Sequence, residues 1–403
     1  MALILQVAAP AEERRVAASI EGGARRTDDA VSAKVAAQYE AHPYPRWTSL
    51  FMCAPGTDIC LEPRSAVTLR GRLLALQRAN VPEEKKQAGE NGNEDDDDDY
   101  SSVGHVEAYL PPFENATVLS AGCGTGRGVI ADALANPGAR FVGVDFSTAS
   151  LAYARTMQRA FNLSNVRFRH SDILRLGEPA PGARAAPTYD VIECSGVLHH
   201  MRDPEQGLAV LRGLLKPRGA MRLALYSGGA RSRAGVSAAR SFALSAGLDG
   251  RKRRDIRRFR EMVMAMHDGR PAALSAPKGG GAFKNLWFGD FHACSDVRDT
   301  VFHAHEVGFT IPEIEALLAR QRMRFLGFEV GPNIRQLFAE FLIAEAQKGN
   351  PSVRAVGKAH LVAQLQSLER WHAFEKQHPM AFGSMYQFWA GAEDGNPQRG
   401  EVK

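Results

Sequence analysis

Short apolar runs alternate with amphipathic stretches from about residue 117 onward, and this alternation is the main structural signal of the chain. Five apolar runs predict buried strands, at 117–121, 140–144, 166–169, 189–193 and 220–226. Apolar positions at helical spacing predict helices between them, at 127–135, 148–161 and 204–215. Because such alternation builds a parallel sheet covered by helices on both faces, the pattern predicts an α/β fold.

The two ends of the chain follow different patterns. Apolar residues at helical spacing predict a helix over 28–40, which stops where Pro43 and Pro45 force an extended turn. Thr310 and Glu313 form a capping box that predicts a helix start. Alternating residues over 385–389 predict a last, antiparallel strand, so that 334–378 is a helical insertion before it.

An acidic stretch at 82–104 divides the chain. It contains five consecutive aspartates and almost no apolar residue, so burial cannot offset the entropy of ordering it, and we expect a disordered loop. The predicted organisation is a helical N-terminal cap (1–81), the acidic loop (82–104), a nucleotide-binding core (105–230), a lid or substrate region (231–322) and a C-terminal part that completes the sheet (323–403).

Composition narrows the class of protein. The 403 residues are 44% apolar and 24% charged, as in globular proteins, and the net charge of +5 does not by itself imply nucleic acid. No apolar stretch approaches the ~20 residues of a membrane helix, and the N-terminus does not resemble a secretory signal. Five scattered cysteines without a CxxC pair indicate reduced thiols. We therefore expect a cytoplasmic protein without a membrane span.

A glycine-rich loop joins the first predicted strand to the following helix. Gly122, Gly124 and Gly126 lie at alternate positions, which differs from the G-x-G-x-x-G of dinucleotide-binding loops. Asp145 ends the second strand, where a carboxylate can accept two hydrogen bonds from a ribose diol. Asp172 follows the third strand, and 193–201 follows the fourth. Four elements in this order predict a nucleoside site at the carboxyl ends of the strands.

These motifs resemble class I S-adenosylmethionine-dependent methyltransferases, with a Rossmann-like sheet. The resemblance implies S-adenosylmethionine as the cofactor, with Asp145 at the ribose, Asp172 at the adenine amino group and the segment after the fourth strand beneath the methionine. Many relatives carry an acidic residue where this chain has Ser120. The implied cofactor-binding residues are Ala121, Gly122, Cys123, Gly124, Gly126, Asp145, Phe146, Ser147, Asp172, Ile173, Ser195 and Gly196.

The methyl acceptor is less clearly marked. No Asn/Asp-Pro-Pro-aromatic motif follows the fourth strand, and no Pro-Cys pair supports a cysteine nucleophile. Residues 197–201 resemble small-molecule methyltransferases of the ubiquinone/menaquinone type, and the flanking segments resemble a bacterial module often fused to tetratricopeptide repeats. We therefore expect a small-molecule acceptor. A doubly wound domain for another nucleotide and a non-catalytic cofactor-binding protein are the alternatives.

Polar and aromatic residues in two flanking segments predict the acceptor site. We expect residues 39–47 to wall the site and 290–306 to orient and deprotonate the acceptor. His199 and His303 are the candidate bases, and Asp299, His303 and Glu306 could share one helical face. His199 and His200 could instead pack against the cofactor or cap a helix, and no metal is expected. The candidate substrate residues are Tyr39, Tyr44, Arg46, Trp47, His200 and Asp299.

A basic segment at 251–260 leaves another class of acceptor open. Seven cations in ten residues could bind RNA phosphates or an acidic protein, which would make the chain an RNA or protein methyltransferase. Apolar residues at helical spacing, Ile256, Phe259, Val263 and Met266, equally indicate an amphipathic helix. We expect this helix to belong to a lid and nucleic acid not to be the partner.

Overall fold

A computed structural model of the chain describes residues 29–44, 115–179, 185–229, 234–267, 294–349 and 358–393. Within them, seven strands form one sheet in the order β3-β2-β1-β4-β5-β7-β6. The first five strands are parallel and β7 is antiparallel to both β5 and β6. The strands are β1 (Thr117–Ala121), β2 (Arg140–Asp145), β3 (Val166–His170), β4 (Tyr189–Ser195), β5 (Leu215–Tyr226), β6 (Met323–Phe328) and β7 (Met385–Ala392).

Helices cover both faces of the sheet, because successive strand residues point to opposite sides. Val118 and Val191 pack in one core with α4 (Arg127–Ala135) and α5 (Thr148–Ala160). Leu119 and Ile192 pack in the other core, with α6 (Pro204–Leu214), α10 (Ile311–Arg320), α11 (Pro332–Gly349) and α13 (Leu368–Gln377). The short helix α12 (Lys358–Leu365) contacts α13. The predicted α/β fold is thus confirmed.

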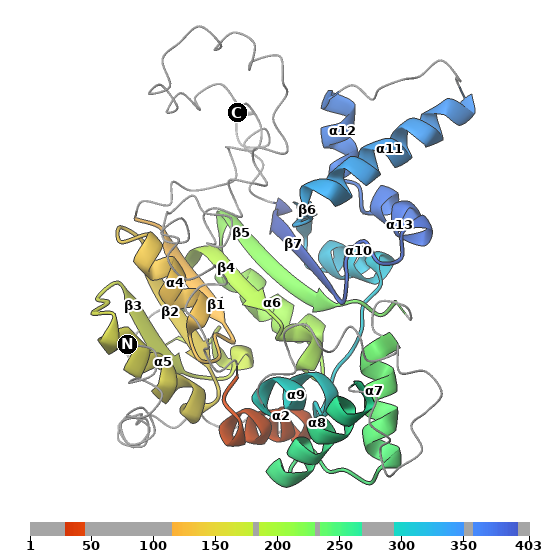
Figure 1. Ribbon diagram of the computed structural model, residues 1–403. Coiled ribbons are helices and arrows are strands. Elements are labelled where there is room, and N and C mark those ends of the chain that lie inside the picture. The colour runs from red at the N-terminus through yellow and green to blue at the C-terminus, as the bar shows by residue number, and fades with distance from the viewer. Residues whose placement is uncertain are drawn as a thin grey trace, which may run out of the picture.

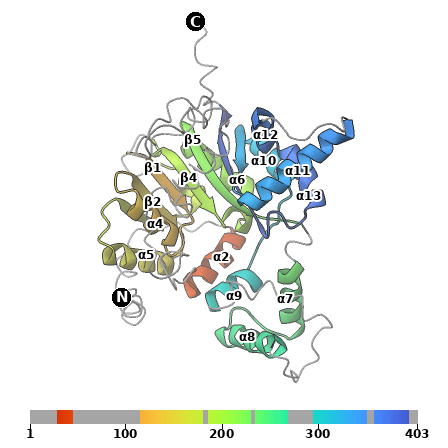
Figure 2. The same cartoon turned by 45° about the horizontal axis from the view of Figure 1, so that its top comes forward.

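A second group of helices lies beyond one end of the sheet, at the bottom of Figure 1. It consists of α2 (Ala30–Ala41), α7 (Ala234–Ser245), α8 (Arg253–His267) and α9 (Cys294–Val301). The same grouping appears after the rotation of Figure 2. The helices α7, α8 and α9 share a small apolar core of their own, centred on Phe242, Phe259 and Val297. This group therefore stands over the sheet end at which parallel strands deliver their loops.

The structure confirms most of the predicted elements and corrects one. The last strand is antiparallel and preceded by α11, α12 and α13, and α10 begins at the predicted Thr310–Glu313 capping box. The basic segment contributes to the amphipathic α8, in which Ile256, Phe259 and Val263 are buried. However, α9 ends at Val301, so His303 and Glu306 lie beyond it and do not share a helical face with Asp299.

Among the described residues, no helix is both long and apolar enough to cross a membrane. The predicted acidic loop at 82–104 and the first 28 residues lie outside the described part of the chain. The proposed division into five segments therefore stays a prediction.

Candidate functional site

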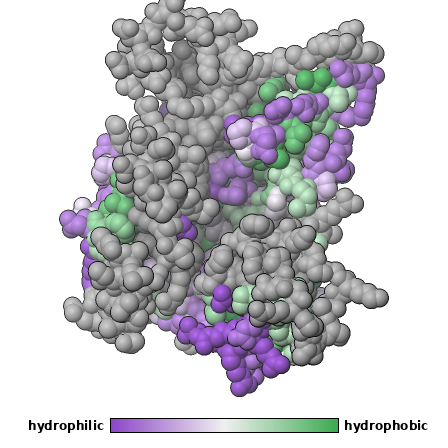
Figure 3. Space-filling model, in the orientation of Figure 1, coloured by the Kyte–Doolittle hydropathy of each residue, from purple (hydrophilic) through white to green (hydrophobic). Residues whose placement is uncertain are grey.

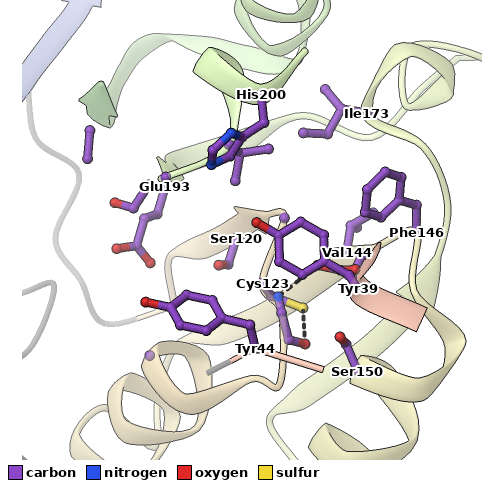
Figure 4. Close-up of a pocket in the computed structure, with 18 of the residues that line it drawn as sticks. Tyr39, Tyr44, Ser120, Cys123, Val144, Phe146, Ser150, Ile173, Glu193 and His200 are labelled. Atoms are coloured by element: carbon purple, nitrogen blue, oxygen red, sulfur yellow. Dashed lines mark hydrogen bonds between the residues drawn. The ribbon is translucent and has the colours of Figure 1, made fainter. Parts of the chain in front are cut away.

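A cavity of about 460 Å³ opens at the carboxyl ends of the parallel strands, a size typical of small-molecule sites. Its walls come from the loops after β1 to β4, from α2 and α9, and from β5 and β7. Figure 4 shows Tyr39 and Tyr44 over the cavity, with Phe146 and Ile173 toward one end and Glu193 and Ser120 toward the other. The predicted site is thus assembled from segments far apart in the sequence.

The glycine loop forms one wall with a backbone that other residues rarely adopt. Gly122, Gly124 and Gly126 have φ angles of +73°, +54° and +77°. A Cβ atom on Gly122 would lie 2.4 Å from Cγ2 of Val197, which comes from the loop after β4. The amide nitrogens of Gly122 and Cys123 donate to the Val144 carbonyl at 2.8 and 2.9 Å, which ties the loop to β2. The backbone of this loop and its packing against Val197 therefore require glycine at 122.

Asp145 is buried at the end of β2, with 7% of its surface exposed. Its two oxygens accept hydrogen bonds from Gly124 N at 2.8 Å and Ser147 N at 2.9 Å. Burial raises the pKa of this carboxyl to about 6, although both amide hydrogen bonds favour the charged form. The carboxylate is therefore held rigidly, and each oxygen retains a lone pair for a ligand hydroxyl.

Ile173 lies toward the same end of the cavity as Phe146 (Figure 4), and Asp172, directly before it in the chain, also lines the cavity. Asp172 precedes the short 3-10 helix η4 (Ile173–Arg175), and its Oδ1 accepts from Leu174 N at 2.9 Å. Ser195 and Gly196 line the opposite side, at the end of β4. Most of the predicted cofactor residues thus surround one cavity; Ala121, Gly126 and Ser147 support its walls without lining it.

Glu40 attaches α2 to the core, a role that the sequence analysis missed. Its carboxylate accepts hydrogen bonds from the hydroxyls of Ser147 and Thr148 and from Ala149 N, all at the start of α5. A carboxylate at a helix N-terminus also interacts favourably with the helix dipole. The carbonyl of Tyr44 accepts from Thr125 N at 3.3 Å, so the chain after α2 contacts the glycine loop as well.

Tyr39 joins the two predicted flanks of the site. Its hydroxyl donates to Oδ1 of Asp299 at 2.6 Å and lies 3.2 Å from Nε2 of His303. Burial and the neighbouring Asp299 carboxylate raise the pKa of Tyr39 well above its ordinary value, so the phenol stays protonated. In addition, Ala304 N donates to the side chain of Gln38 at 3.0 Å. Helices α2 and α9, named here the α2–α9 cover, therefore meet above the cavity.

The histidines occupy different positions around the cover. His200 lines the cavity, and its Nδ1 lies 2.9 Å from the carbonyl of His305, which places a proton on Nδ1 and leaves Nε2 able to accept. His199, in η5 (Leu198–His200), is fully buried, and its Nδ1 accepts from Tyr226 N. The geometry thus brings His200 to the cavity and places His199 in the core behind it.

His303 stacks on His200 behind Tyr39, with ring centroids 3.6 Å apart. Its Nδ1 accepts from His305 N at 3.1 Å, so the neutral ring carries its proton on Nε2. Burial, with a smaller contribution from His200, lowers the pKa of His303 to about 2. A neutral ring with an occupied acceptor nitrogen is poorly suited to remove a proton from a substrate.

His200, Asp299 and His303 also offer ligand atoms that lie within 4.8 Å of one another, a spacing that a divalent cation can use. Ligation through Nε2 of His303 would require its Nδ1 to give up the hydrogen bond from His305 N. Asp299 already accepts from Tyr39. The hydrogen bonds present therefore favour a relay from His303 through Tyr39 to Asp299 over a metal site.

A buried ion cluster closes the end of the cavity opposite Asp172. Arg222 on β5 is 2% exposed and forms ion pairs with Glu193 on β4 at 2.9 Å and with Glu329 at 2.7 Å. Glu329 also accepts from the indole nitrogen of Trp389 on β7 at 2.7 Å. Glu193 and Arg222 were not predicted as site residues, although a charged residue within a largely apolar strand is a signal for such a role.

Two predicted substrate residues, Arg46 and Trp47, lie outside the described residues. The cations of α8 that face outward include Arg254, Arg257 and Arg258, and Figure 3 shows a hydrophilic patch over this helix. Arg254 pairs with Asp255, and Arg251 and Lys252, just before the helix, pair with Asp249. Acidic neighbours thus partly neutralise the basic segment.

Comparison with known proteins identifies the central part of the chain. Residues 119–221 match a family model described as a methyltransferase domain. A ubiquinone biosynthesis O-methyltransferase of Paracidovorax citrulli is 31% identical over 110 residues, which are 27% of this chain and 43% of that protein. The protein syc1184_c of Synechococcus is 36% identical over 120 residues, 29% of this chain and 27% of its own length. The chain thus spans less than half the length of these relatives.

Among solved structures, PKMT2 from Rickettsia typhi superposes with a TM-score of 0.52 and 16% sequence identity, covering 85% of this chain and 54% of that one. At this identity the match bears on the fold, and it confirms the arrangement of the sheet and its helices.

Proposed function

We propose that this chain, in which residues 119–221 form a class I S-adenosylmethionine-dependent methyltransferase domain, transfers the methyl group of S-adenosylmethionine to a small-molecule acceptor. The observation that carries the proposal is the cavity beneath the α2–α9 cover, because it continues from the cofactor residues to a set of polar groups suited to an acceptor. Its lining includes Asp145 and Asp172 from the strand ends, together with Tyr39, His200 and Asp299.

The residues present fit S-adenosylmethionine. Asp145 can accept hydrogen bonds from the ribose hydroxyls, and Asp172, which also lines the cavity, can accept from the adenine amino group. Gly122 and Gly124 line the cavity without side chains, so the backbone of the glycine loop can approach the ligand closely. When bound, this cofactor supplies an electrophilic methyl group on its sulfonium sulfur, so the protein has chiefly to align an acceptor and exclude water.

The cover supplies that alignment and exclusion. Tyr39 and Asp299 come from helices 260 positions apart in the chain, and their 2.6 Å hydrogen bond closes the cavity over the expected position of the methyl group. The hydroxyl of Tyr39 is fixed by Asp299 and His303, so its ring presents a rigid wall. The hypothesis that 39–47 walls the site and 290–306 orients the acceptor rests on this contact.

His200 is the best-placed base where the acceptor carries a proton. Its Nδ1 donates to His305 O, which makes Nε2 the acceptor nitrogen, and the residue lines the cavity. His303 is neutral, with its proton on the nitrogen that faces Tyr39, and His199 lies in the core. We therefore assign proton removal to His200 and a positioning role to His303, in place of the roles that the sequence suggested for His199 and His303.

A macromolecular acceptor is the second candidate, because the outward face of α8 is rich in arginine (Figure 3). Phosphates of RNA or an acidic protein surface would bind such a face in a strongly salt-dependent manner. The ion pairs with Asp249 and Asp255 reduce its charge, and the cavity of about 460 Å³ has the size of a small-molecule site.

A labelled-methyl assay on fractionated cell extract tests the proposal. Protein, cofactor with a labelled methyl group and extract fractions are incubated, and label is followed into metabolites, RNA and protein. We expect label in the low-mass fraction. The Asp145→Ala variant is the control and should transfer no label. Label found only in RNA or protein would contradict a small-molecule acceptor but not the transfer itself. Absence of label in every fraction, together with failure to bind the cofactor, would contradict the transferase function.

A further inference from the structure

The carboxylate of Glu193 reaches the cavity with one oxygen uncommitted. Its Oε1 accepts from Nη1 of Arg222 at 2.9 Å. Among the described residues, Oε2 accepts no hydrogen bond and lies 3.9 Å from the place of a Cβ on Gly128, in the first turn of α4. The side chain is 15% exposed and lines the cavity. Oε2 is therefore a charged acceptor that a ligand in the cavity can reach.

The charges around Arg222 lead to the same conclusion. The guanidinium is shared between Glu193 and Glu329, so the two ion pairs contain two negative charges and one positive charge. Burial opposes the charge of Arg222, but the hydrogen bonds and charge of Glu329 raise its pKa above the ordinary value, with a contribution from Asp132. A buried cluster with excess negative charge is unfavourable unless a cation joins it. A ligand cation beside Glu193 would offset part of this excess negative charge.

The position of Glu193 in the cavity indicates which ligand cation it would bind. It lies at the end of the cavity opposite Ile173 and Phe146 (Figure 4). With the adenosine between Asp145 and Asp172, the amino acid part of the cofactor extends toward this end, and it carries one ammonium group. Ser120 on β1, the register partner of Glu193, also lines the cavity but offers only a hydroxyl.

We propose that Glu193, on β4, binds the α-ammonium group of S-adenosylmethionine through Oε2, while Arg222 holds its Oε1. The proposal rests on the cofactor assignment above. Glu193 on β4 is the register partner of Ser120 on β1. Its negative charge therefore lies on the same face of the sheet as the Ser120 side chain, one strand away. Arg222 is a positioning residue in this arrangement, since its hydrogen bond to Oε1 fixes the orientation of Glu193.

Calorimetry with two ligands tests this assignment. S-adenosylhomocysteine contains the ammonium group, whereas methylthioadenosine lacks the whole amino acid part. Glu193→Gln keeps an acceptor for Arg222 but removes the charge. We expect it to weaken binding of S-adenosylhomocysteine roughly ten- to a hundredfold, as for one charge-assisted hydrogen bond, and to change that of methylthioadenosine less than about twofold. A second change, Ser120→Asp, should restore part of the loss.

Glu329→Gln is the matched control, because it also removes a carboxylate from Arg222 but does not line the cavity. It should leave the ratio of the two affinities unchanged. Equal losses for both ligands in Glu193→Gln, or no loss for either, would overturn the proposal. If the variant does not fold, a deaminated analogue of S-adenosylhomocysteine is measured on the unaltered protein, and equal affinity for the two would overturn it.

The failure of the proposed function gives a different result. A protein that binds S-adenosylhomocysteine with the predicted dependence on Glu193 but transfers no methyl group would contradict the transferase function and support the ammonium site. A protein that binds neither ligand would contradict both.

Discussion

At the scale of single residues, the burial of Asp145 makes cofactor affinity depend on pH. The carboxyl has a pKa of about 6 in the protein, and hydrogen bonds from ribose hydroxyls favour the charged form. Binding therefore releases a proton below pH ~6, and affinity rises as pH increases through this value. We expect the dissociation constant of S-adenosylhomocysteine at pH ~5 to be roughly tenfold higher than above pH ~7.

The control is Asp145→Asn, which cannot ionise. Its affinity should be lower at neutral pH, by about 1.5–3 kcal/mol for each charge-assisted hydrogen bond that is lost, and should not respond to pH between ~5 and ~7. Calorimetry of both proteins in one set of buffers makes the comparison. A pH response retained in the variant would assign it to another group.

Gly122 gives a second prediction at this scale. Alanine there would adopt φ +73° and place its Cβ 2.4 Å from Val197. The left-handed backbone alone costs about 1–2 kcal/mol, and the contact must displace the loop after β4. We expect Gly122→Ala to lower the melting temperature and weaken cofactor binding. Gly138→Ala, where the added Cβ meets nothing within 4 Å, is the control, and an equal effect of both would refute this account.

At the scale of secondary structure elements, periodicity predicted the parts of the fold that depend on local burial. The five parallel strands were predictable because they contain short apolar runs or, in β3, buried apolar residues that alternate with exposed arginines. The end of α9 was not, because 299–306 keeps helical spacing while the chain turns away after Val301 to pair with β5 residues. The relay at Tyr39 and the cluster at Arg222 depend on contacts between distant segments, which no local pattern contains.

The role of Glu40 in holding helix α2 against α5 can be tested by substitution. Glu40→Gln removes the charge that accepts from Ser147, Thr148 and Ala149 at the start of α5. We expect a loss of about 1 kcal/mol or more in unfolding free energy, since the change removes a charged cap. Amide hydrogen exchange should increase selectively in α2. Glu315→Gln, on the exposed face of α10, should change neither quantity. Unchanged exchange in α2 would show that other contacts hold it.

At the scale of the whole molecule, the site exists only because three segments converge. Residues 29–44 and 294–309 meet above loops from 115–229, and the contact between Tyr39 and Asp299 joins them. Tyr39→Phe tests that contact. It removes one hydrogen bond to a charged group and keeps the ring, so cofactor affinity should stay within about twofold while acceptor turnover falls. A parallel loss of cofactor affinity would instead show that Tyr39 belongs to the cofactor site.

The basic helix α8 distinguishes the two classes of acceptor in the intact molecule. Changing Arg254, Arg257 and Arg258 to glutamine removes three outward charges but leaves Ile256, Phe259 and Val263 in their apolar core. A small acceptor enters the cavity without contacting that face, so its rate of methylation should change less than about twofold.

The rate of methylation of a small acceptor should also respond little to salt between ~50 and ~200 mM. By contrast, each phosphate contact to a nucleic acid would make binding fall steeply with salt. The measurement is transfer of labelled methyl to the acceptor fraction by both proteins at both salt concentrations. A large loss in the rate of methyl transfer, either in the triple variant or at high salt, would place the acceptor on α8. The molecule would then be a methyltransferase for a macromolecule.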